Sequence, residues 1–191
     1  MKFPKNHEGF KNIIFVGRTS VGKSSLLNKL FKTNLKVSKG RCTKGVEPIA
    51  IFKNKIRVFD CQGFDKKFNL TENPEMIPKY LGAMDAIYYL YEDPEDDVVK
   101  TCLSLQKEFY AVRTKCDPSN KPEENEYLRK VDRQDFEEMG VKDPLIFFTS
   151  AEGGEDNDKL LHHILSNGPA TEKSSSSPWE NISERLHQRK P

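Results

Sequence analysis

The glycine-containing segment at 17–24 constrains the fold of this chain more than any other feature. It reads Gly-Arg-Thr-Ser-Val-Gly-Lys-Ser and matches the pattern G-x-x-x-x-G-K-[S/T] throughout. An apolar run at 12–16 precedes it, and leucines and a phenylalanine at helical spacing follow it to residue 31. A strand, a glycine loop and a helix in this order predict a phosphate-binding loop.

Strands and helices are expected to alternate along the rest of the chain, which is typical of a parallel sheet covered on both faces. Apolar runs at 48–52 and 55–59 predict a hairpin with a turn at 53–54, and this hairpin supplies one antiparallel edge strand. The further expected elements are a helix at 74–81, a strand at 85–91, a helix at 95–106, a strand at 109–113, a helix at 123–139, a strand at 145–149 and a helix at 158–165. The pattern therefore predicts an α/β, three-layer P-loop NTPase fold with a mostly parallel six-stranded sheet. One domain is expected at 1–166, followed by a flexible, disordered tail at 167–191.

Composition narrows the class of protein. Lys and Arg number 31 and Asp and Glu number 29, so the net charge of +2 does not indicate nucleic-acid binding. No apolar run approaches the roughly 20 residues of a membrane-spanning helix, and no secretory or lipidation signal is recognisable, so a cytoplasmic location is expected and membrane association is not indicated. The cysteines have no metal-ligand spacing and are expected to be small buried thiols: Cys42, Cys61, Cys102 and Cys116.

The residue types of the loop suit a nucleoside triphosphate bound with Mg²⁺. Its backbone N–H groups and those of the next helical turn are expected to surround the phosphates. Lys23 is expected to reach the β- and γ-phosphate oxygens, and the Ser24 hydroxyl to coordinate Mg²⁺. The residues expected to bind the nucleotide here are Gly17, Arg18, Thr19, Ser20, Val21, Gly22, Lys23, Ser24 and Ser25.

A D-x-x-G pattern, Asp60 to Gly63, ends the second strand of the expected hairpin. Asp60 is expected to hold Mg²⁺ through water, and the Gly63 amide to meet the γ-phosphate. A plain turn at the end of the strand is the alternative. Thr43 is expected to complete the Mg²⁺ shell from the preceding polar loop, where Thr33 and Ser38 are competing hydroxyls.

Two short segments after later strands are expected to select the base. The segment at 114–117 reads Thr-Lys-Cys-Asp, and Asp117 can accept both N1–H and the 2-amino group of guanine. Adenine would leave that carboxylate unpaired, at a cost of about 1–3 kcal/mol. Thr114 belongs to the same motif, Lys115 is expected to lay its stem along the purine, and Ser150 with Ala151 is expected to bind guanine O6 through the Ala151 amide. The sequence therefore favours a protein that binds guanine nucleotides over an ATPase or a nucleoside kinase.

These five elements, in this order, resemble the G1 to G5 set of the TRAFAC-class GTPases, which include Ras-like, Era-like and septin-like proteins. The resemblance covers roughly residues 11–166 and implies a Ras-like G domain that binds GTP or GDP with Mg²⁺. Residues 42–47 and 112–117 most resemble the immunity-related (interferon-inducible) GTPases, with some AIG1-type features. Those proteins carry additional helices around the G domain, so membrane remodelling and self-assembly are not carried over.

The resemblance also bears on catalysis, for which Lys23, Thr43 and Gly63 are the expected residues. Ras-like proteins place a water-orienting glutamine after the D-x-x-G glycine, whereas this chain has Phe64 there. Gln62 precedes the glycine and should point elsewhere. We therefore expect a GTPase switch with slow intrinsic turnover, stimulated by an activating protein or by homodimerisation through the nucleotide face, and read by an effector. A non-catalytic, guanine-nucleotide-dependent interaction module is the alternative.

Overall fold

The computed structural model describes residues 9–35, 46–52, 55–61, 63, 80–116, 119 and 122–167. Its strands are β1 (Lys11–Gly17), β2 (Val46–Phe52), β3 (Ile56–Cys61), β4 (Ala86–Tyr91), β5 (Glu108–Arg113) and β6 (Ile146–Phe148). Its labelled helices are α1 (Lys23–Phe31), α3 (Asp96–Ser104), α4 (Pro122–Glu138) and α5 (Asn157–Ser166). These elements lie close to the predicted bounds. The helix expected at 74–81 falls mostly outside the described residues, although 80–82 are helical, and the turn at 53–54 and residues 168–191 lie outside them as well.

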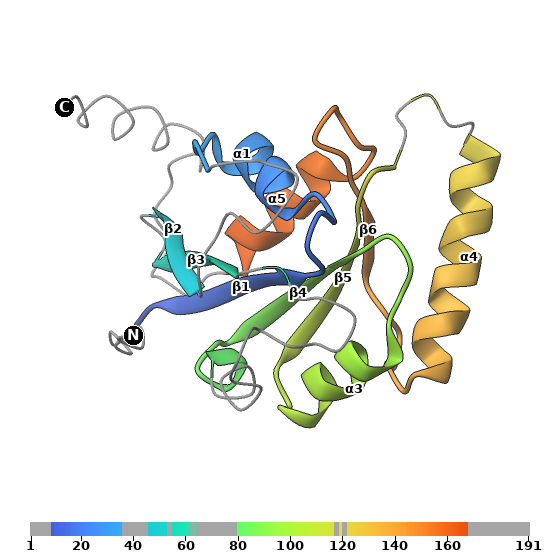
Figure 1. The fold of residues 1–191 in the computed structure, drawn as a ribbon, viewed down its shortest axis with the longest axis horizontal. Helices are drawn as coiled ribbons and strands as arrows, with labels where there is room; N and C mark the ends of the chain where they lie inside the picture. The colour runs from blue at the N-terminus through green and yellow to red at the C-terminus, as the bar shows by residue number, and fades with distance from the viewer. Residues whose placement is uncertain are drawn as a thin grey trace.

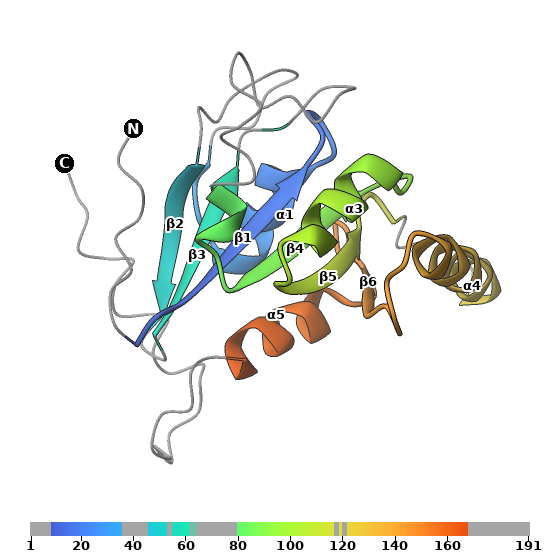
Figure 2. The same ribbon diagram turned by 90° about the horizontal axis from the view of Figure 1, so that it is seen from below.

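The strands form a single sheet in the order β2-β3-β1-β4-β5-β6, seen in sequence across Figure 2. β2 runs antiparallel to β3, and the other neighbouring pairs are parallel. The predicted mostly parallel six-stranded sheet with one antiparallel edge strand is therefore confirmed. Because the parallel strands share one direction, the segments that follow their carboxyl ends meet along one edge of the sheet.

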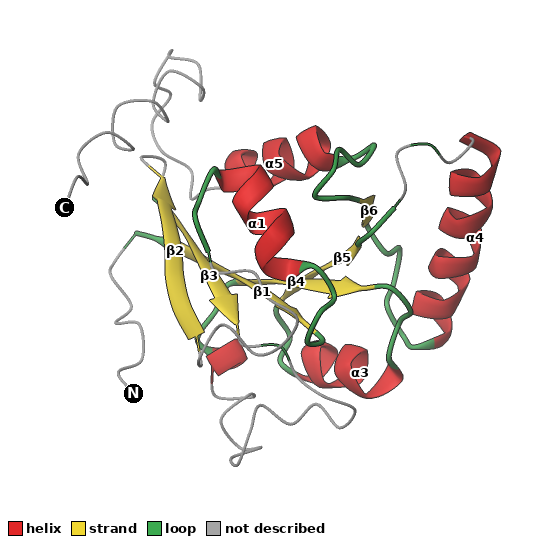
Figure 3. Cartoon of the chain, turned by 45° about the horizontal axis from the view of Figure 1, so that its top comes forward, coloured by secondary structure: helices red, strands yellow, loops and turns green. Residues whose placement is uncertain are grey.

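Alternation along β1 explains the layers on the two faces of the sheet. Ile13 and Phe15 pack with residues of α1 and α5, whereas Ile14 and Val16 pack with residues of α3. Figure 3 shows α1 and α5 on one side of the sheet and α3 on the other. In Figure 1, α4 stands beside the β6 edge, and its Phe136 is buried in the layer that contains α3. The helices of the described part are each too short or too polar to cross a bilayer.

His163 of α5 is half-buried among aromatic rings of the sheet. Its ring centroid lies 4.5 Å from that of Tyr110 and 5.2 Å from that of Phe147. Burial lowers the pKa of His163, and the charge of Lys11 lowers it further, while Glu108 opposes them. Folded His163 therefore stays neutral at a pH at which the unfolded chain is already protonated.

This lowered pKa predicts that the fold loses stability in mild acid. The stabilising contribution is complete above the unfolded pKa of about 6.5 and is lost as the pH falls from there through the folded pKa. His163→Gln should therefore flatten the dependence of the urea-unfolding free energy on pH between about 7 and 5. The exposed neighbour His162 is the last of the causes that lower the pKa of His163, so His162→Gln should change the slope much less than His163→Gln does. An unchanged slope in the His163 variant would contradict the prediction.

Candidate functional site

The loop after β1 has the backbone geometry of an anion-binding turn. A Cβ atom at Gly17 would lie 2.5 Å from the Leu90 carbonyl oxygen, so a side chain does not fit between β1 and β4. Ser20 and Gly22 adopt positive φ angles of 68° and 93°, which turn the chain into α1. Gly22 is the N-cap of α1 and makes no side-chain cap. The first N–H groups of α1 can therefore be directed to an anion at the mouth of the loop.

Three side chains with the chemistry for phosphate and Mg²⁺ gather below this loop. Lys23, the first residue of α1, is 7% exposed. The Ser24 hydroxyl donates to Asp60 Oδ2 at 3.3 Å. Asp60 is fully buried on β3, which pairs directly with β1. A hydroxyl facing a carboxylate is a pair of hard oxygen donors, so these residues fit Mg²⁺.

Gly63 packs directly on the glycine loop. A Cβ atom at this position would lie 2.6 Å from Thr19 Cα and 2.7 Å from Thr19 N, so no side chain fits there. The glycine of the D-x-x-G pattern is therefore brought beside residues that are expected to hold the phosphates. Its contact with the γ-phosphate stays a prediction.

Thr114 joins the base motif at 114–117 to the glycine loop. Its hydroxyl donates to the Val21 carbonyl at 2.7 Å, and its N–H donates to the Tyr91 carbonyl at 2.9 Å. The side chain is buried, so this hydroxyl is shielded from competing water. The sequence places Thr114 among the nucleotide-binding residues, and the structure shows that it also fixes the loop that should bind the phosphates.

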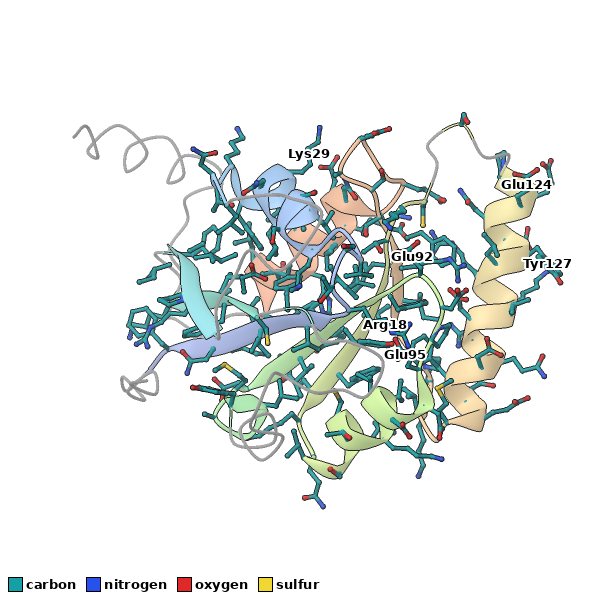
Figure 4. The ribbon with its side chains drawn as sticks, in the orientation of Figure 1. Arg18, Lys29, Glu92, Glu95, Glu124 and Tyr127 are labelled. Carbon is teal, nitrogen blue, oxygen red and sulfur yellow. The ribbon has the colours of Figure 1, made fainter. Side chains whose placement is uncertain are left out.

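Lys115 follows Thr114 in a left-handed conformation with φ 56°. Its Nζ lies 2.6 Å from Glu92 Oε1, and about half of each side chain is exposed. Glu92 directly follows β4 and is labelled in Figure 4. The structure thus holds the Lys115 ammonium outside the interior, and the contact of its stem with a purine stays a prediction.

The base motif is hydrogen-bonded to the second base loop, residues 149–151. The Thr149 N–H donates to the Arg113 carbonyl at 2.8 Å, and the Cys116 N–H donates to the Thr149 carbonyl at 3.1 Å. These bonds continue the pairing of β5 with β6 beyond the strand ends. The two segments that are expected to read guanine are therefore joined by backbone hydrogen bonds.

Asn157 holds the second base loop from the start of α5. Its side-chain amide donates to the Ser150 carbonyl at 2.7 Å and accepts the Ser150 N–H at 3.2 Å. Gly154 closes the loop, because a Cβ there would lie 2.3 Å from Ser150 N. Ala151 is exposed. Its bond to guanine O6 stays a prediction.

Several predicted residues lie outside the described part of the chain: Ser38, Thr43, Gln62, Phe64 and Asp117. Thr33, a competitor for the magnesium role of Thr43, is described, and its hydroxyl donates to Asn28 Oδ1 at 2.8 Å. Thr33 is thus engaged at the end of α1. Within the described residues there is no group of three or more His, Cys, Asp or Glu placed to hold a metal ion.

The cysteines in the described part behave as the buried thiols predicted from the sequence. Cys61, Cys102 and Cys116 are free and buried. Burial raises the pKa of Cys61 to about 12 and that of Cys102 to about 12, and it also raises the pKa of Cys116. Because the thiolate is the reactive form, burial keeps these side chains inert near neutral pH. Cys42 lies outside the described residues.

Arg18 ties the glycine loop to the start of α3. Its Nη2 donates to Glu95 Oε2 at 2.6 Å, and its Nε pairs with Glu95 Oε1. The Glu95 N–H donates to the Tyr89 hydroxyl at 3.2 Å. Figure 4 shows Arg18 and Glu95 next to each other, below Glu92. The Arg18 side chain is therefore paired with a carboxylate, and contact of Arg18 with a nucleotide stays a prediction.

A double-mutant cycle tests this tie. We expect a coupling energy of about 1 kcal/mol in urea unfolding of the ligand-free protein, measured with Arg18→Gln, Glu95→Gln and the double variant. The value is moderate because the ion pair is bidentate but partly exposed. The matched control is the exposed Asp96 and Lys100 pair on α3, at 2.7 Å, for which about 0.3–0.5 kcal/mol is expected. A coupling no larger than the control would show that Arg18 does not anchor the loop.

Some residues that shape the site were not predicted from the sequence: Glu92, Glu95, Arg113 and Asn157. Glu92 and Glu95 follow β4, and Arg113 ends β5. Their positions in the sequence, at or just after the ends of predicted strands, could have identified them. Side chains just beyond the carboxyl ends of parallel strands gather at the ligand-binding edge. Asn157 follows the second base loop closely in sequence and could have been found in the same way.

Comparisons with known proteins agree with this geometry. Residues 12–122 match the family described as 50S ribosome-binding GTPase. Cell division control protein 10 of Candida albicans is 33% identical over an alignment 96 residues long, which covers 42% of this chain and 27% of that protein. The sequence similarity therefore extends over the glycine loop, the D-x-x-G pattern and the base motif.

Solved structures of Era share the fold. Era in complex with MgGDPNP and a segment of 16S ribosomal RNA superimposes with a TM-score of 0.64 and 22% identity, over 88% of this chain and 60% of that chain. Aquifex aeolicus Era bound to GDP.AlF4- gives a TM-score of 0.61 and 23% identity, over 86% of this chain and 58% of that chain. The chain thus spans about three fifths of each Era chain. The likeness confirms a Ras-like P-loop G domain.

Proposed function

Because this chain belongs to the family of 50S ribosome-binding GTPases, we propose that it binds GTP and GDP with Mg²⁺ and hydrolyses GTP slowly as a molecular switch. The observation that most directly supports this function is the hydrogen bond from Ser24 to the buried Asp60. It brings together the two oxygen donors that a G domain needs beneath the phosphates. The guanine preference rests on the base motif and the second base loop.

Catalysis by these residues would consist of positioning and charge stabilisation. Lys23 and the N–H groups of the loop would stabilise the charge on the transferring phosphoryl group. Ser24, Thr43 and Asp60 would hold Mg²⁺, which would supply positive charge to offset that of the phosphates. The Gly63 N–H would donate to the γ-phosphate. Order in the segments around Thr43 and Gly63 would then differ between the GTP and GDP states.

Slow turnover follows from the apolar side chain of Phe64, which cannot orient a water molecule. An activating protein or a second copy of the chain, bound at the nucleotide face, would supply the missing group. The finer resemblance to the immunity-related and AIG1-type GTPases stays a prediction, as does a cytoplasmic location. The binding of 16S ribosomal RNA is a property of the Era complex and is not transferred to this chain. With a net charge of +2, the chain gives no reason to propose RNA as its partner.

The second candidate function is a non-catalytic module that binds GTP or GDP and keeps it, and Phe64 is the residue that favours it. Nucleotide-free protein should be mixed with GTP over a wide range of protein concentrations, with bound nucleotide and released phosphate both identified. A slow rate of phosphate release per protein molecule that increases with protein concentration supports a switch that is activated by homodimerisation. Release at several turnovers per second without concentration dependence contradicts slow intrinsic hydrolysis. GTP that stays intact at every concentration favours the module, and bound ATP would overturn the choice of base.

A further inference from the structure

Asp132 of α4 is buried although α4 is a charged helix. It is 1% exposed, and its carboxylate accepts hydrogen bonds from the Tyr91 hydroxyl at 2.8 Å and from Arg113 Nη1 at 2.5 Å. Arg113 is the last residue of β5, and Thr114 of the base motif follows it directly. This contact therefore joins α4 to the strand that carries the base motif.

Arg129, on the same helix, makes a second inward contact. Its Nη2 lies 2.5 Å from Asp156 Oδ2, and its guanidinium carbon lies 4.2 Å from the centre of the Phe148 ring. The same carboxylate oxygen accepts the Phe148 N–H at 2.9 Å. Asp156 precedes Asn157, which holds both polar groups of the Ser150 backbone. This contact therefore joins α4 to the second base loop.

The opposite side of α4 faces solvent. Figure 4 shows Glu124 and Tyr127 pointing away from the domain, and Tyr127 is 67% exposed. The inward contacts differ from these because each includes a carboxylate that is almost completely buried. A buried ion pair has a defined geometry, and breaking it leaves an uncompensated charge in the interior. The two pairs therefore set the position of both base segments relative to α4.

We infer that Asp132 and Arg129 are positioning residues for guanine recognition, acting through Arg113 and Asp156 on the two segments that read the base. This inference rests on the proposed binding of guanine nucleotides. Neither residue touches the ligand. Both keep the base motif and the second base loop at the spacing that a guanine ring requires.

The test is the ratio of affinities for GDP and IDP, measured by isothermal titration on the full chain. IDP lacks the 2-amino group, so the ratio reports how well the predicted carboxylate of the base motif is placed. Asp132→Asn and Arg129→Gln should each reduce this ratio about tenfold. A general loss of stability would weaken both nucleotides alike and leave the ratio unchanged.

Two control variants lie on the same helix. Glu126→Gln removes the solvent-exposed pair with Lys130, at 2.8 Å, and should leave the ratio at the wild-type value. Phe136→Leu lowers stability by altering a fully buried core ring and should also leave the ratio unchanged. Thermal unfolding of each variant verifies that the titrations are made on folded protein.

The outcomes separate this inference from the proposed function. A wild-type preference for GDP over IDP that persists in the Asp132 and Arg129 variants overturns the inference alone. An equal fall of the ratio in Phe136→Leu also overturns it, because the effect would then follow stability. Wild-type protein that binds ADP as well as GDP contradicts the proposed function, and the inference falls with it.

Discussion

Lys23→Met is expected to reduce the stabilisation of the chain by GDP and Mg²⁺ by about half or more. Methionine keeps an unbranched stem in this buried position, which is 7% exposed, but it removes the ammonium that should meet the phosphates. Losing one partner of a buried charge pair costs about 2–5 kcal/mol, or roughly 30-fold to several thousand-fold in Kd. In a thermal-unfolding assay with GDP at about 1,000 times the wild-type Kd, wild type should gain about 4 kcal/mol, close to 10 °C, and the variant about 2 kcal/mol or less.

The matched control for this experiment is Lys29→Met on the same helix. Lys29 lies in the last turn of α1, is exposed and points away from the domain in Figure 4. Its replacement should leave the nucleotide-dependent shift intact. If Lys23→Met keeps the full shift, the glycine loop does not bind phosphate through its lysine, and the proposed site is wrong.

Asp117→Asn is expected to exchange the base preference from guanine to xanthine. Xanthine has a carbonyl oxygen in place of the 2-amino group of guanine, so an asparagine amide can donate where the aspartate could only accept. The variant should lose GDP affinity by about a hundredfold or more, because charge-assisted bonds to N1–H and the 2-amino group are lost together. It should bind XDP more tightly than wild type does. Competition of both diphosphates against a fluorescent nucleotide measures the two changes.

A control with the same chemical change is Asp143→Asn. Asp143 has a side chain that is 92% exposed, and it pairs with Arg133 at 2.9 Å on the surface. This variant should retain the wild-type order of GDP and XDP. If Asp117→Asn weakens both diphosphates equally, Asp117 contributes to binding without reading the exocyclic group, and the assignment of the base motif has to be revised.

Much of the fold could be read from local pattern. The apolar run before Gly17 and the helical spacing after it predicted β1 and α1, and alternating elements predicted the parallel sheet. The chemical types of Ser24, Asp60 and Gly63 were also readable, because each lies at the end of an element in a recognisable short motif. The structure brings these three beside the same loop.

Other parts of the site depended on contacts between distant segments. The Thr114 hydroxyl reaches the Val21 carbonyl across 93 positions of sequence, and Arg18 reaches Glu95 across 77. Nothing in the glycine motif itself indicates which carboxylate an arginine at its second position will meet. That partner is chosen by the order of strands, which places the segment after β4 next to the loop after β1.

The helix α4 shows most clearly where local pattern ends. Asp132 and Arg129 lie in a run of charged residues that is typical of a solvated surface. Asp132 is nevertheless 1% exposed, and Arg129 pairs with the buried Asp156. The sequence was sufficient to locate the glycine loop, the D-x-x-G pattern and the base motif, because each is a short run of adjacent residues at the end of a strand, and their roles toward the nucleotide and Mg²⁺ stay predictions. The tertiary structure decided which charges are buried and paired, since a charge can be buried only where another element supplies its partner.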